Sequence, residues 1–207
     1  MEKCAYICKI FIEMEKIDRA TMIKMLEERM KSLYEHGNAD VQRLDKELER
    51  TPKDVELWFE SGLAHNQSGL QYLDMAFEKA RLEYFEANPD AEEEPEHLDV
   101  DAPEAWAMFN AAVAAFDKVI ELEPEYYGVQ CQRGVALGNM QRYEEAVECY
   151  RKALEEDEED YAAAYYLACA YRDMGDEESA KRYFAMAKEL NPDDEGMTGM
   201  RGAPIEG

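Results

Sequence analysis

Apolar residues recur at helical spacing through the C-terminal third of the chain. In residues 161–194, Leu167, Ala168 and Tyr171 share one face of a predicted helix. Gly175 then interrupts the pattern, and Ala180, Phe184 and Ala187 form a second stripe before Pro192. The pattern predicts two antiparallel helices joined by a short turn, because small residues allow close approach and the aromatic rings fill the remaining space.

The preceding 34 residues repeat this pattern. In 127–160 the matching residues are Gly134, Leu137, Tyr143, Ala146, Tyr150 and Ala153. Prolines that follow predicted helix ends occur at positions 52, 89, 124 and 192, with spacings of 37, 35 and 68 residues. Since 68 is twice 34, one proline is missing from this series, and Glu158 stands at its expected position. A period near 34 residues with two helices per period predicts a solenoid of helical hairpins.

These units resemble the tetratricopeptide repeat (TPR) family, whose pattern is Trp-x2-Leu-Gly-x2-Tyr followed by Ala-x3-Phe, Ala and Pro. Unit 161–194 departs from it at Ala164, which stands in place of Trp, and unit 127–160 departs at Arg133 and Glu158. The resemblance implies an all-α fold, a right-handed α-α superhelix of antiparallel helix pairs. It also implies a protein–protein interaction module.

The earlier units are more divergent. Residues 55–90 keep Trp58, Gly62 and Gly69 but need a one-residue deletion to align a second helix, and residues 103–124 supply only a second helix. Residues 69–87 and 103–122 each have the pattern of one long helix, and both align as second helices. Either a short helix lies in the acidic insert between them, or they pack on each other and reset the stacking; we favour the second arrangement.

The domain organisation follows from these units. We expect N-terminal helices with a degenerate first repeat in 1–54, divergent TPR-like helices in 55–126 with an acidic insert at 90–102, repeats at 127–160 and 161–194, and a flexible tail at 195–207. Positions that face the next unit are apolar in the earlier units: Val41, Leu48, Val113, Ile120, Val147 and Leu154. Their equivalents in the last unit are Lys181 and Lys188, so the array should end near Pro192. Residues 1–15 could cap the first unit, contact a second copy or bind a partner.

Charge narrows the range of partners. The net charge is −25, and residues 51–207 hold −24 of it. Phosphate backbones and anionic membranes need a basic surface, so neither nucleic acid nor membrane binding is expected. The insert could be a solvated loop or a docking surface for a basic partner. The candidate docking residues are Glu92, Glu93, Glu94, Asp99 and Asp101.

Other classes of site find little support in the sequence. Cys4 to Ile12 is too short and too charged for a signal peptide core or a membrane helix, so five reduced cysteines in a cytoplasmic protein are expected. Cys4 and Cys8 have no second ligand pair nearby, so no metal site is expected. No nucleotide-binding, zinc-protease or serine-hydrolase motif occurs, and we expect neither an enzyme nor a cofactor.

The remaining expectation is binding of a partner protein. By resemblance to the family, the first helix of each unit lines a concave groove that holds a segment of the partner. The groove candidates are Cys131, Val135, Asn139, Tyr165, Cys169 and Arg172. This row suits an apolar segment flanked by Lys or Arg, although Cys131 and Cys169 could equally be packed core residues. We therefore expect an adaptor or scaffold, a monomer or weak homodimer; the alternative is an assembly factor or dedicated client chaperone.

Overall fold

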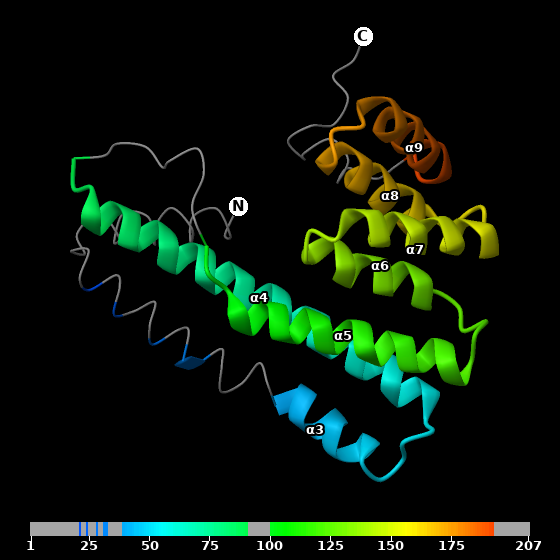
Figure 1. Ribbon diagram of the computed structural model, residues 1–207, viewed down its shortest axis with the longest axis horizontal. Coiled ribbons are helices and arrows are strands. Elements are labelled where there is room, and N and C mark those ends of the chain that lie inside the picture. Colours follow the sequence, from blue (N-terminus) through cyan, green and yellow to red (C-terminus); the bar gives the residue numbers. More distant parts are fainter. Residues whose placement is uncertain are drawn as a thin grey trace, which may run out of the picture.

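The computed structural model describes residues 39–90 and 100–192, together with a few isolated positions between 21 and 32. Within these residues every regular element is an α-helix, so the expected all-α class is confirmed. The helices are α3 (Ala39–Leu48), α4 (Val55–Ala87), α5 (Pro103–Leu122), α6 (Val129–Asn139), α7 (Tyr143–Glu156), α8 (Tyr161–Asp173) and α9 (Glu177–Leu190). Each packs on the next along the chain, and the stack runs from α3 at one end to α9 at the other (Figure 1).

The two C-terminal hairpins form as their apolar patterns indicate. Gly175 takes a left-handed conformation in the turn between α8 and α9, with φ of 82°, and Gln141 takes the same conformation between α6 and α7. The side chains of Asp160 and Asp176 accept hydrogen bonds from backbone N–H groups at the starts of α8 and α9. Turn conformation therefore ends α6 and α8, and side-chain capping sets the starts of α8 and α9.

A glycine opposite an aromatic ring sets the distance between paired helices. A Cβ atom built on Gly134 in α6 would lie 2.6 Å from Cε1 of Tyr150 in α7. Gly62 in α4 faces Phe116 of α5 in the same way, with a corresponding distance of 2.5 Å. These separations are shorter than van der Waals contact, so the rings occupy the space that side chains at these positions would need.

The structure corrects the interpretation of residues 55–90. Gly69 does not break a helix, because α4 is continuous over 33 residues and Gly69 lies buried within it. Its missing side chain leaves room for Phe109 of α5, to which a Cβ would come within 2.5 Å. Packing against this ring offsets the roughly 1 kcal/mol by which glycine disfavours a helix interior. The absence of a side chain is a packing feature here rather than a helix stop.

Helix α4 as a whole is the first helix of its unit, and α5 is its second. Residues 70–87 and 103–122 do pack on each other, as favoured from the sequence, but the stacking is not reset. The unit is a TPR-like hairpin of 72 residues, from 55 to 126, in which both helices are lengthened at the turn. The possible short helix at 91–99 lies outside the described residues.

The stacking positions along the solenoid are placed as expected. Val113 and Val147 are buried between successive units, whereas Lys181 and Lys188 on α9 are exposed. The last described hairpin therefore presents a charged face at the end of the stack. Residues 1–15 and 195–207, for which a cap and a flexible tail are expected, lie outside the described residues.

Candidate partner-binding groove

The first helices of successive units line the inner side of the stack. Contacts join α4 to α6 and α6 to α8, while among the described helices no second helix touches the next second helix. The first helices are thus closer together than the second helices, and the stack curves around them. The concave side predicted from the resemblance is therefore formed by α4, α6 and α8.

A hollow of about 140 Å³ lies on this side, between α6, α7 and α8. It contains three of the six predicted groove residues, Val135, Asn139 and Cys169. Tyrosine rings form much of the wall, and those of Tyr150 and Tyr166 stack with their centroids 6.0 Å apart. The hollow is open enough to receive a side chain from another molecule.

The other three predicted residues have different environments. Cys131 is only 3% exposed, so it is a core residue with little surface to offer a partner. Tyr165 is half-buried, and its ring meets that of Phe184 edge-on at 5.9 Å. Arg172 is occupied by an ion pair with Asp173, with 2.9 Å between Nη2 and Oδ1. Tyr165 and Arg172 thus border the hollow rather than line it.

The thiol and phenol groups of this region are uncharged at neutral pH. Burial raises the pKa of the Cys169 thiol, and it raises the pKa of Tyr165 to about 12. Burial also raises the pKa of the Cys131 thiol to about 12. The one charged side chain in the lining is Asp173, and its carboxylate is paired with Arg172. An apolar group that enters therefore meets mainly uncharged side chains, with Asp173 as the one charged group in the lining.

Helix α4 contributes groove residues that were not predicted from the sequence. Leu63 occupies the position in α4 that Val135 occupies in α6 and Cys169 in α8, and it is 38% exposed. Next to it, Asn139 Nδ2 donates a hydrogen bond to Asn66 Oδ1 at 3.1 Å, which ties α6 to α4. The spacing from Trp58 to Gly62 could have located this row, had residues 55–69 been read as the start of one long helix.

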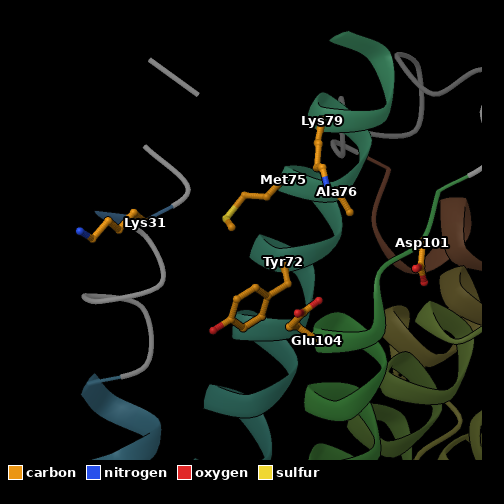
Figure 2. A pocket seen from close by; sticks show the side chains of 7 residues that line it. All are labelled: Lys31, Tyr72, Met75, Ala76, Lys79, Asp101 and Glu104. Atoms are coloured by element: carbon orange, nitrogen blue, oxygen red, sulfur yellow. The ribbon is translucent and has the colours of Figure 1, made fainter. Parts of the chain in front are cut away.

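Of the five residues predicted to form an acidic docking surface, the structure describes only Asp101. Asp101 is exposed near the start of α5, where it lines a cavity of about 330 Å³ with Glu104, Tyr72, Met75, Ala76, Lys79 and Lys31 (Figure 2). This cavity is formed by α4, the start of α5 and Lys31, away from the hollow between α6, α7 and α8. Glu92, Glu93, Glu94 and Asp99 lie outside the described residues.

Metal ions and membranes concern two further classes of site in the described residues. Across these residues, no cluster of three or more His, Cys, Asp or Glu side chains could hold a metal ion. Of the helices that the structure describes, none combines the length and the apolar character needed to cross a membrane.

Comparison with known proteins bears on the repeats. Residues 129–160 and 162–194 each match a sequence profile described as tetratricopeptide repeat. Protein bimA of Emericella nidulans is 32% identical over 110 residues, which cover 47% of this chain and 14% of that protein. The chain thus spans a small part of the relative that it matches.

Solved structures of MamA are also similar, at low identity. One crystal structure is 21% identical with a TM-score of 0.39, covering 78% of this chain and 92% of that one. Another, of MamA residues 41 to the end from Desulfovibrio magneticus RS-1, is 12% identical with a TM-score of 0.39, covering 84% and 97%.

Proposed function

Because this chain is a tetratricopeptide repeat protein, we propose that it is a non-catalytic scaffold that binds a segment of a partner protein in its concave groove. The observation that carries the proposal is the hollow between α6, α7 and α8, which is lined mainly by apolar and tyrosine side chains and opens on the inner side of the stack. Repeats of this family typically bind other proteins, and their stacked first helices form an extended concave surface.

The proposed ligand is an apolar segment with flanking Lys or Arg residues. The row Leu63, Val135 and Cys169 supplies one apolar group from each successive unit, so a segment that follows the groove would meet all three. The surrounding molecule is strongly acidic, with −24 of net charge in residues 51–207. A basic flank would gain from this field, chiefly in association rate and specificity.

The experiment that tests the proposal is an affinity pull-down from native lysate with the Tyr165→Ala/Cys169→Arg variant. Arginine at 169 places a charge in the hollow, and alanine at 165 removes a ring from its border. Loss of a central contact costs about 2 kcal/mol or more, which corresponds to about 30-fold weaker binding. We expect one dominant protein that the wild type retains and the variant loses.

Ala185→Arg is the matched control, since it adds the same charge at an exposed position of α9. Circular dichroism should show that both variants keep the helical content of the wild type. Retention of the same proteins by the wild type and the groove variant would contradict the proposal. The identity of the partner then separates the two functions: an adaptor bridges two stable proteins, and a chaperone copurifies with one aggregation-prone client.

A further inference from the structure

Helices α4 and α5 extend beyond the unit that stacks on them. We call residues 70–87 of α4 and 103–109 of α5 the arm. Helix α4 is 33 residues long and α6 only 11, so at 1.5 Å per residue α4 is about 50 Å long and α6 about 17 Å. Figure 1 shows the arm reaching well past the end of α6. The stacking face of this hairpin is therefore longer than the α6–α7 hairpin covers.

Apolar residues continue along that uncovered face. On α4, Asn66 contacts α6, and Leu73 and Phe77 follow it by 7 and 11 residues, which places all three on one side of the helix. On α5, Trp106 precedes Val113 by 7 residues and shares its side, and Val113 is buried against the next unit. The stacking stripes of both helices thus continue into the arm.

These residues meet at the root of the arm. Leu73, Trp106 and Met140, from the α6–α7 turn, pack against one small core cluster with Phe109 at its centre. Phe77 lies one turn beyond Leu73 and is 47% exposed, although it is a large aromatic residue. We call Leu73, Phe77, Trp106 and Met140 the arm corner. It is an apolar surface at the point where the next unit ends.

The charges around the arm corner are predominantly acidic. Within the described part of the arm the two basic side chains, Lys79 and Arg81, form ion pairs with Glu83 and Glu78, at 3.7 and 3.4 Å. Further exposed carboxylates lie on the arm and in the segment that joins its two helices: Asp74, Glu86, Asp90, Asp101 and Glu104. The residual charge is negative, so it favours a cationic partner.

We propose that the arm corner is a second docking surface, separate from the groove, which binds a basic amphipathic helix of a partner protein. Bulky apolar residues on one face of that helix would cover Phe77 and Trp106, in the position that a helix of the next unit would take if it were longer. Lys and Arg on its other positions would face the carboxylates of the arm. Contact with the apolar residues supplies affinity, and the charges select the partner.

Site-specific photocrosslinking tests this proposal directly. Phe77 is replaced by the photoreactive benzoylphenylalanine in the 207-residue chain. The chain is then irradiated in native lysate, and the crosslinked peptide is sequenced. Tyr127, which is 70% exposed on the loop before α6, receives the same replacement as a control. We expect position 77, and not 127, to crosslink to one segment of another protein with amphipathic helical spacing and an excess of Lys and Arg.

Two further measurements sharpen the test. Crosslinking should fall several-fold between about 50 and about 500 mM salt, because charge attraction between exposed groups is screened. A synthetic peptide of the crosslinked segment should bind Phe77→Ser about tenfold more weakly than wild type. Cys169→Arg should leave both results unchanged, which separates this surface from the proposed groove function. Crosslinks to residues 1–20 of the same chain, to a second copy, to an acidic segment or to nothing would each overturn the proposal.

Discussion

At the scale of single residues, glycines that face aromatic rings determine how closely the helices pair. Gly62, Gly69 and Gly134 each lie within helical backbone and each leave room for the edge of a ring. Gly62 and Gly69 are seven residues apart, as are their partners Phe116 and Phe109. The same contact is thus made twice along one hairpin, once in the repeat and once at the root of the arm.

Substitution of Gly69 by alanine should therefore destabilise the fold. The new Cβ would stand 2.5 Å from a ring carbon of Phe109, which is fully buried and cannot move away freely. Overpacking of this kind costs about 1–3 kcal/mol, and alanine regains about 1 kcal/mol in helix propensity. We expect urea unfolding to report a net loss of about 1 kcal/mol. The control is Gly138→Ala, whose Cβ would meet only Tyr150 Oη at 3.4 Å. Equal effects of the two substitutions would contradict this account.

Tyr126 makes a pH-sensitive connection between the segment after α5 and the start of α4. Its hydroxyl donates to Glu56 Oε2 at 2.7 Å, and this hydrogen bond, with burial and nearby carboxylates, raises the pKa of Tyr126 to about 12. An unfolded tyrosine ionises near pH 10. The folded chain therefore keeps a proton that the unfolded chain loses, so this stabilisation is complete below about pH 10 and is lost as the pH rises to about 12.

The Tyr126→Phe variant should lose stability less steeply over this range. Urea unfolding at intervals from about pH 9 to about pH 12 measures the slope for each protein. Glu56→Gln, which keeps an acceptor but removes the charge, should fall between the two. Parallel curves for wild type and Tyr126→Phe would show that this hydrogen bond does not contribute.

At the scale of elements, the arm is an elaboration of an ordinary hairpin. The repeat-like contact between Gly62 and Phe116 lies at its base, where the unit stacks on its neighbours. The cluster around Ala102, Ala105 and Phe109 belongs to the arm and meets the rest of the molecule through Met140. The arm should therefore be dispensable for the repeat fold.

The test is a variant in which residues 68–108 are replaced by Met-Gly-Asp, the sequence of the turn at 174–176. Phe109 is also changed to Tyr, the residue at the equivalent position 143 of the next unit. We expect a helical protein that unfolds cooperatively. The m value, which is the slope of the unfolding free energy against urea concentration, should fall by about a fifth. This is because the m value scales with the surface exposed on unfolding, and 38 of 207 residues are gone. The shortened chain should no longer bind the synthetic peptide of the segment that crosslinks at position 77, and it should keep its groove partner. A chain that no longer folds would show that the arm is part of the structural core.

At the scale of the whole molecule, the last described unit presents a charged end face, which we expect to prevent further stacking. Val147 and Leu154 in α7 pack toward the next unit, while Lys181 and Lys188 occupy the equivalent places in α9 and are exposed. A polar end face keeps an open solenoid from adding further units or copies.

The Lys181→Val/Lys188→Leu variant should therefore self-associate. Size-exclusion chromatography with light scattering should show a concentration-dependent increase in mass that the wild type lacks. Lys152→Leu/Arg182→Leu removes two positive charges and adds apolar surface at exposed positions away from the stacking row, so it should keep the wild-type mass. Association of both variants would mean that added apolar surface in general, and not the end face, is responsible.

Much of this protein is determined locally by its sequence. The helices of 127–194, their turns and the charged end face follow from residues within one hairpin, such as Tyr150, Gly175 and Lys181, because apolar period, turn conformation and stacking position act over short distances. The apolar character of the groove also follows, since Val135 and Cys169 hold equivalent places in successive units.

The course of residues 55–122 was decided only by the tertiary structure. In the sequence, Gly69 looks like Gly175, a glycine between two helical patterns, and nothing nearby shows that it lies against Phe109, forty residues away. Long-range contact with that ring keeps α4 continuous and so creates the arm. The same reason explains why Cys131, predicted to line the groove, is a core residue, and why Leu63 joins the groove row: burial and neighbours depend on helices that are distant in the chain.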